Sequence, residues 1–180
     1  LMTTEKKTKI CFISNSSGKS GGAERTLPNF VHSLKMKGTD VLVVLPSKGE
    51  MLNELKKLNI NCIVLPFKMW MHEKCPLWKK IAISILNLII LIPLSIKILH
   101  WNCDIILSNT ITISIGAMVS KLTCRKHVWY IREFGYEDHG RTFDLGNKIS
   151  YWLINRSSDL YIFNSYAVKD KYEKFLPVQK

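Results

Sequence analysis

Residues 9–45 decide the fold, and in one-letter code they are KICFISNSSGKSGGAERTLPNFVHSLKMKGTDVLVVL. The runs Lys9–Asn15 and Asp40–Leu45 contain short, nearly continuous apolar segments, which are typical of parallel strands covered on both faces. Between them, residues 23–37 show an amphipathic helical pattern that ends at Gly38, a favoured residue after a helix. This order of strand, helix and strand predicts a right-handed β-α-β unit.

The same alternation continues along the rest of the chain. Further strands are expected at 60–65, 104–107, 127–131 and 159–163, and further helices at 50–58, 77–99, 112–122, 146–156 and 165–175. This pattern predicts an α/β protein, a Rossmann-like three-layer α/β/α domain with a mostly parallel sheet of roughly six or seven strands. The 180 residues suit one such domain covering 1–180.

The position of a functional site follows from this topology. Doubly wound sheets bind ligands beyond the carboxyl ends of their strands. The loops after Asn15, Pro46, Ser108, Ile131 and Asn164 are therefore the first places to expect one.

Charge and cysteine content narrow the class of protein. Lys and Arg total 26 against 14 acidic residues, and the formal charge of +12 favours an anionic partner, although a solvated basic surface is the alternative. The five cysteines form no CxxC pair, which argues against a disulfide framework and against a zinc site. The apolar run at residues 10–13 is too short for a signal peptide core, so a cytoplasmic protein is expected.

Residues 77–99 form an unusually apolar helical pattern. No charge occurs from Ile81 to Ile96, while Ser84, Asn87 and Ser95 fall on one narrow stripe. About 20 apolar residues span a bilayer, so this segment is slightly short for a span. The alternatives are a buried core helix and a helix that dips into a membrane surface, which would place the protein at the inner face of the membrane.

A glycine-rich segment follows the first strand. Such a turn, where it opens a helix, lets backbone N–H groups approach a phosphate. A Walker A loop ending in Gly18-Lys19-Ser20 would need glycine where Ile13 stands, and the GxGxxG fingerprint of dinucleotide-binding proteins is absent. A nicotinamide enzyme is thus disfavoured, and Gly21 and Gly22 either approach a phosphate or simply permit a tight turn.

Three segments carry a resemblance to a known family. Gly21-Gly22-Ala23-Glu24-Arg25 before an amphipathic helix, Asp104-Ile105-Ile106-Leu107-Ser108-Asn109 at a strand end, and Arg156-Ser157-Ser158-Asp159 followed by Ser165 occur in this order. Together they resemble the N-terminal half of family 4 glycosyltransferases, which are retaining enzymes of the GT-B fold.

The resemblance implies a two-domain enzyme that transfers a sugar from a nucleotide-sugar to a cell-surface polysaccharide or glycolipid acceptor. Residues 1–180 would be the acceptor-binding half, inactive alone, and the C-terminal donor-binding domain would lie outside the chain. Gly21 and Gly22 would approach the donor diphosphate, without a metal or other cofactor. The substrate-binding candidates that the resemblance implies are Glu24, Arg25, Asn109, Asn164 and Ser165.

One departure from the family concerns the loop after Ile131. Many members carry a histidine there that contacts the transferred sugar, whereas this chain has Arg132-Glu133. Arg132 could bind phosphate or a carboxylated sugar with two N–H groups, and Glu133 could accept hydrogen bonds from sugar hydroxyls or act as a base. His139 could move protons near neutral pH. The alternative is a surface ion pair between Arg132 and Glu133, with His139 an ordinary loop residue.

Two other interpretations stay open at this stage. A basic Rossmann-like module could bind nucleic acid or a phosphorylated ligand without catalysis, although the sequence carries no recognised nucleic-acid signature. The aromatic, basic stretch 68–74, which includes His72, is expected to be a loop that is either solvated or in contact with a membrane or an acceptor.

Overall fold

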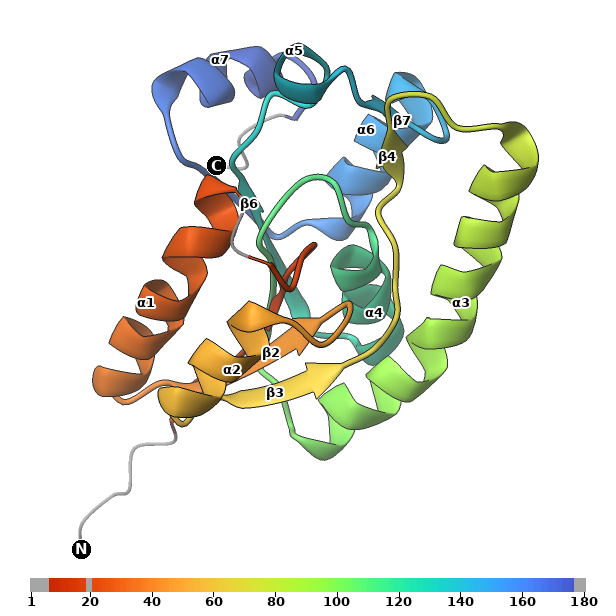
Figure 1. Cartoon of the computed structure of the whole chain (residues 1–180). Coiled ribbons are helices and arrows are strands. Elements are labelled where there is room, and N and C mark those ends of the chain that lie inside the picture. The colour runs from red at the N-terminus through yellow and green to blue at the C-terminus, as the bar shows by residue number, and fades with distance from the viewer. Residues whose placement is uncertain (1–6, 19–20, 177–180) are drawn as a thin grey trace, which may run out of the picture.

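The computed structural model describes residues 7–18 and 21–176, and it contains a six-stranded parallel sheet. Along the chain its strands are β1 (Lys9–Ile13), β2 (Asp40–Leu45), β3 (Asn61–Val64), β5 (Ile105–Ser108), β6 (Lys126–Ile131) and β8 (Leu160–Phe163). Their order across the sheet is β3-β2-β1-β5-β6-β8, with every neighbouring pair parallel. The predicted Rossmann-like three-layer fold is confirmed (Figure 1).

The helices alternate with these strands as expected. They are α1 (Gly22–Met36), α2 (Glu50–Lys57), α3 (Leu77–His100), α4 (Ile115–Thr123), α6 (Asn147–Ser157) and α7 (Tyr166–Glu173). A single-turn helix, α5 (Tyr136–His139), lies between β6 and α6, where no helix was predicted. Pro28 lies inside α1 and Pro93 lies inside α3.

Alternate residues of the central strands separate two apolar cores. Phe12, Val43 and Leu45 pack with α1 and α2 on one side, while Ile13 and Val44 pack with α3 and α4 on the other. All of these side chains are inaccessible to solvent. Because a sheet buried on both faces needs apolar residues at successive positions, the continuous apolar runs of β1 and β2 follow directly from this packing.

A third core lies beyond β6 and was not apparent from the sequence. Two short strands, β4 (Met71–His72) and β7 (Thr142–Phe143), pair antiparallel, and their side chains pack with Trp129 of β6. The indole of Trp70 stacks on that of Trp129 with ring centroids 6.2 Å apart, and its Nε1 donates to the carbonyl of Ile111. The prediction of a loop over 68–74 is therefore wrong at 71–72, because buried aromatic contacts hold this segment in a strand.

His72 has a defined partner in this third core. Its Nδ1 lies 2.9 Å from Oδ1 of Asp144, a nearly buried carboxylate that also lies 3.6 Å from Nζ of Lys80 on α3. This hydrogen bond gives His72 a structural role, so it is not part of a freely solvated loop.

The long helix α3 is neither fully buried nor separate from the domain. Its inward side chains Ile90, Leu94 and Ile98 belong to the core on the α4 side of the sheet. Figure 1 shows α3 along one side of the domain, with one flank turned away from the other elements. By length and composition alone α3 is long and apolar enough to cross a membrane, and 28% of its most apolar stretch is buried. A core helix that is buried all round is therefore excluded.

Candidate functional site

Two adjoining cavities open at the carboxyl edge of the sheet, where the topology predicted a site. The first, of about 760 Å³, is here called the arginine cavity and is lined by Asn15, Ser16, Gly21, Gly22, Glu24, Thr26, Met69, Arg132, Glu133, Asp138, Arg141 and Asn164. The second, of about 840 Å³, is called the lysine cavity and is lined by Asn15, Ser16, Ser17, Gly18, Pro46, Ser47, Lys48, Gly49, Glu50, Phe67, Lys68 and Met69. The two cavities adjoin, since they share Asn15, Ser16 and Met69, and together they are here called the cleft.

The start of α1 forms one wall of the arginine cavity. Gly21 is the extended N-cap residue and Gly22 is the first residue of the helix, so the positive end of the helix dipole faces the cavity. A Cβ on Gly21 would lie 2.1 Å from Oε2 of Glu24, whereas a Cβ on Gly22 would meet nothing within 4 Å. The absence of a side chain at Gly21 thus leaves room for the Glu24 carboxylate. At Gly22 it leaves the backbone uncovered in the cavity wall.

Arg132 connects three elements around this cavity. Its guanidinium lies over the Tyr130 ring, with Cζ 4.8 Å from the ring centroid. Nη2 donates to Oγ1 of Thr26 on α1 over 2.7 Å, and Nη1 donates to Oδ1 of Asn109 after β5 over 3.4 Å. These contacts hold a permanent positive charge beside the first turn of α1, which makes this wall attractive to an anionic group.

Glu133 adds a titratable carboxylate to the same wall. Its Oε2 accepts a hydrogen bond of 2.9 Å from the backbone N–H of Arg132. The pKa of Glu133 is raised to about 7, chiefly by burial; the hydrogen bond and the charge of Arg132 oppose this rise, and the nearby charges of Asp138 and Glu24 add to it. A carboxyl with this pKa is partly ionised at neutral pH, so it can both accept and release a proton there.

The loop after Glu133 turns back over the cavity. Gly135 has a φ of +79°, and Oδ2 of Asp138 accepts a 2.7 Å hydrogen bond from the N–H of Phe134. Lys171 of α7 donates to the carbonyl of Phe134 and to the carboxylate of Glu137. These contacts place Asp138 at the cavity, while the side chain of His139 lies outside the described part of the structure.

The remaining predicted residues divide into two groups. Asn164 lines the cavity and donates from Nδ2 to the carbonyl of Arg132 over 3.0 Å. Asn109 is fully buried behind Arg132, and within the described structure its Nδ2 has no hydrogen-bond partner. Arg25 is exposed on α1 outside the cavity lining, and Ser165 accepts from the N–H of Val168 as the N-cap of α7.

Sequence reasoning missed several residues of the cleft. Ser16, Met69, Asp138 and Arg141 line the arginine cavity without having been singled out. Asp138 and Arg141 follow the predicted Arg132-Glu133 pair closely, so proximity in sequence was the available signal. Met69 reaches the cleft from the segment between β3 and β4, and its signal was the aromatic, basic stretch 68–74, one interpretation of which was a loop in contact with an acceptor.

The lysine cavity is more basic than its neighbour. Lys48 and Lys68 contribute positive charge against the single carboxylate of Glu50. Oγ of Ser17 donates to the carbonyl of Ser47 over 2.6 Å and ties the loops after β1 and β2 together. The arginine cavity instead combines Arg132 and Arg141 with the three acids Glu24, Glu133 and Asp138. Such a mixed lining suits a polyhydroxylated ligand, because carboxylates accept hydrogen bonds from hydroxyl groups.

The described fold defines a class, namely the Rossmann-like three-layer α/β/α domain that also occurs in solved GT-B structures. HepE of Anabaena, solved in complex with UDP, is 22% identical with a TM-score of 0.66, covering 93% of this chain and 41% of that one. A glycosyltransferase from Rickettsia africae ESF-5 is 17% identical with a TM-score of 0.66, covering 97% and 41%. A UDP-N-acetylglucosamine 2-epimerase is 16% identical with a TM-score of 0.55, covering 94% and 45%.

These likenesses show the fold, and the chain spans about two fifths of the length of HepE and of the Rickettsia protein. No protein-family model matches the sequence, and no curated protein matches it significantly.

Proposed function

We propose that this chain is the acceptor-binding N-terminal half of a retaining glycosyltransferase, and that a second half outside it binds a nucleotide-sugar. The observation that carries the proposal is the arginine cavity, where the bare turn Gly21-Gly22, the Arg132 guanidinium and the Glu133 carboxyl meet. Phosphate binding at a helix start and hydroxyl binding by carboxylates are the interactions that such a transfer requires.

The residues have separable roles in this proposal. Arg132 and the N–H groups at the start of α1 stabilise negative charge that develops on the leaving diphosphate. Glu133 orients an acceptor hydroxyl and, with a pKa of about 7, is suited to take its proton. Asn164 supports Arg132 from behind through the backbone carbonyl. The proposed acceptor is a cell-surface polysaccharide or glycolipid, and the proposed location is the cytoplasmic side of the membrane.

The first test is the gene sequence downstream of Lys180 together with the activity of its complete product. We expect a second Rossmann-like half that carries a pair of glutamates. The complete protein should release UDP from a UDP-sugar only when a lipid-linked or oligosaccharide acceptor is added, and UDP-glucose is the first donor to test because HepE was solved with it. Turnover that needs an added divalent metal would contradict the proposed metal-independent chemistry.

A second candidate is sugar epimerisation, because a UDP-N-acetylglucosamine 2-epimerase shares the fold. An epimerase would change the configuration of UDP-N-acetylglucosamine without an acceptor and without releasing UDP during the reaction. Proton NMR of the sugar nucleotide distinguishes the two reactions directly. The non-catalytic alternative, a module for nucleic acid, predicts oligonucleotide binding that falls steeply with salt, and acids in the arginine cavity weigh against it.

A further inference from the structure

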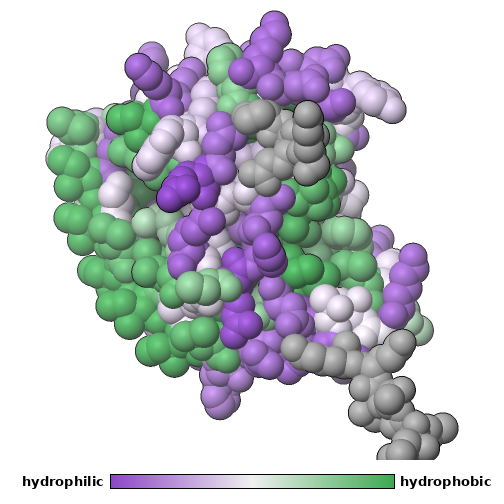
Figure 2. Space-filling view, turned by 180° about the vertical axis from the view of Figure 1, so that it is seen from behind, coloured by the Kyte–Doolittle hydropathy of each residue, from purple (hydrophilic) through white to green (hydrophobic). Residues whose placement is uncertain are grey.

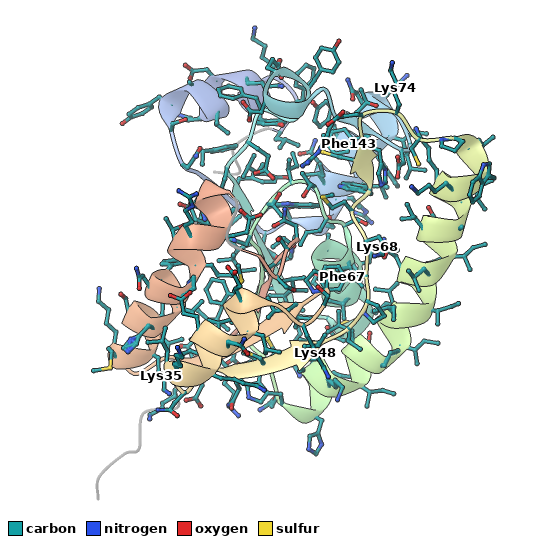
Figure 3. All side chains as sticks on the ribbon, in the orientation of Figure 1. Lys35, Lys48, Phe67, Lys68, Lys74 and Phe143 are labelled. Carbon is teal, nitrogen blue, oxygen red and sulfur yellow. The ribbon has the colours of Figure 1, made fainter. Side chains whose placement is uncertain are left out.

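The outward flank of α3 is a continuous apolar surface. The side chains between 49% and 73% exposed recur at three- and four-residue spacing, and they are Leu77, Trp78, Ile81, Ile85, Leu88, Ile89, Ile92, Ile96 and Leu99. Figure 2 shows apolar residues gathered along this side of the molecule, and in Figure 3 the side chains of α3 project away from the domain. This surface is here called the α3 face.

Asn87, one member of the polar stripe of this helix, points the opposite way, whereas Ser84 is exposed. Asn87 is buried, its Oδ1 accepts from the N–H of Lys68 over 2.9 Å, and its Nδ2 donates to the Lys68 carbonyl over 3.0 Å. A soluble helix normally turns its polar residues outward and its apolar residues inward. Here both flanks are apolar and the amide serves a fixed internal bond, so the α3 face is not explained by the packing of the described domain.

A bilayer-spanning arrangement does not fit these contacts. Ile90, Leu94 and Ile98 pack into the same core as the central strands, so α3 cannot enter the hydrocarbon without the domain. A helix with one flank on a protein and one apolar flank free can instead lie in the plane of the membrane interface.

Charge at the two ends of the helix distinguishes the possible occupants. The helix contains no acidic residue, and its exposed Lys79 and Lys97 lie near opposite ends. Lys74 is exposed as well; it precedes α3 in the sequence and lies beside the N-terminal end of the helix (Figure 3). If a second copy paired through this face, lysines would oppose lysines in either a parallel or an antiparallel arrangement, which costs free energy. Anionic lipid headgroups complement both ends at once.

We propose that the α3 face docks this protein on an anionic bilayer, with α3 lying in the interface and its lysines among the headgroups. The excess of basic residues, 26 against 14, adds long-range attraction to such a surface. Docking of this kind does not depend on catalysis, so it stands independently of the proposed transferase activity.

The docked helix would be rigidly connected to the cleft. Lys68, which Asn87 holds against α3, lines the lysine cavity, and the next residue, Met69, lines both cavities. Lys80 at the start of α3 also lies 3.6 Å from Asp144 in the third core. The membrane-bound helix and one wall of the cleft therefore move as a unit, which keeps the cleft next to the lipid surface.

Vesicle flotation tests the docking. The chain should float with vesicles of phosphatidylcholine and phosphatidylglycerol, and bind vesicles of phosphatidylcholine alone about tenfold more weakly or less. Equal binding to both vesicles would overturn the anionic requirement. Failure to bind either vesicle, with a dimer in light scattering, would assign the α3 face to a second copy instead.

Variants that place glutamate on two different helices identify the surface responsible. Ile85→Glu with Ile92→Glu puts charge on the α3 face at positions 52% and 66% exposed, so folding measured by circular dichroism should be unchanged. We expect the bound fraction to fall about tenfold or more. The control is Ile149→Glu with Trp152→Glu on α6, where the two side chains are 53% and 62% exposed and the change in net charge is the same. Unchanged flotation of the α3 variant, or equal loss in the control, would refute the proposal.

Tryptophan fluorescence gives a second, independent readout. Trp78 on the α3 face is 71% exposed and Trp152 on α6 is 62% exposed. Anionic vesicles should shift the emission of the chain to shorter wavelength, and Trp78→Phe should remove this shift while Trp152→Phe keeps it. A shift that survives Trp78→Phe would place the bilayer on another surface.

Discussion

His127 lies near the amino end of β6, and Glu133 lies just beyond its carboxyl end. Burial favours the neutral form of both side chains, lowering the pKa of His127 to about 3 and raising that of Glu133 to about 7. His127 lies in a closed core with Nε2 2.9 Å from Oγ of Ser108, whereas Glu133 opens into a cavity. The same desolvation thus produces an enclosed neutral group at one end of the strand and, at the other, a cavity-lining group that titrates near neutral pH.

The strongest test of this difference is the removal of the Glu133 charge. Glu133→Gln preserves shape and hydrogen bonding but cannot take a proton, so turnover of the complete enzyme should fall about 10²–10⁴-fold. Release of UDP measures the effect. Glu137→Gln is the matched control, because Glu137 pairs with Lys171 outside the cavity lining. Similar rates for Glu133→Gln and the wild-type enzyme would remove Glu133 from the proposed reaction.

The closed core beside His127 should respond through stability instead. A Cβ on Gly116 would lie 2.2 Å from Oγ of Ser108 and 3.5 Å from Nε2 of His127. We expect Gly116→Ala to lower the free energy of unfolding by about 1–3 kcal/mol, because the buried Ser108 cannot move without disturbing its neighbours. Urea denaturation monitored by circular dichroism measures this loss. A wild-type midpoint would show that this core is looser than the contacts indicate.

The stability of the protein should depend on pH with opposite sign for the two groups at the ends of β6. The folded-state pKa of His127 is below its unfolded value, so its contribution to stability is fully present above about pH 6.5 and is lost toward pH 3. The slope is at most about 1.4 kcal/mol per pH unit for one proton. His127→Gln should flatten the acid limb in urea denaturation measured between these pH values.

Glu133 should change the stability of the folded protein at alkaline pH. Its folded-state pKa is raised from 4.5 to about 7, so its contribution is fully present below about pH 4.5 and is lost as the pH rises through 7. Glu133→Gln should therefore raise the melting temperature at pH 8 relative to wild type, and this gain should disappear at pH 4. A gain of equal size at both pH values would point to packing instead of charge.

Gly22→Ala is expected to have the smallest effect on stability but a clear effect on turnover. Its added Cβ would meet nothing within 4 Å but would project into the wall of the arginine cavity. Gly22→Ala should leave the urea midpoint unchanged, in contrast to Gly116→Ala, and weaken donor turnover about tenfold by keeping a phosphate away from the helix start. A large loss of stability would show that Gly22 is needed for the turn itself.

The sequence predicted the sheet and its principal helices because each of these elements has its own local pattern of apolar residues. The apolar runs at β1 and β2 and the helix stop at Gly38 need no knowledge of distant residues. The pair β4–β7 and the turn α5 could not be predicted, since they are too short for a period. They depend on distant contacts such as the stacking of Trp70 on Trp129.

The candidate site was predictable in place but not in composition. Topology put it at the carboxyl edge, and the glycine turn and Arg132-Glu133 do meet there. The bond from Arg132 to Thr26 joins residues 106 positions apart, and no local pattern contains that information. Arg25 and Ser165 were chosen from motif likeness, and the structure places them outside the cavity lining.

Pro93 has a consequence for how deeply α3 can settle into a bilayer. Proline has no N–H, so the helix cannot supply the usual donor to the carbonyl of Ile89 four residues earlier. Ile89 lies on the α3 face, 60% exposed. An unsatisfied carbonyl is costly in hydrocarbon but is readily hydrated among headgroups. We expect this peptide group to limit how deeply the helix enters the bilayer, so that the protein stays at the level of the polar lipid surface.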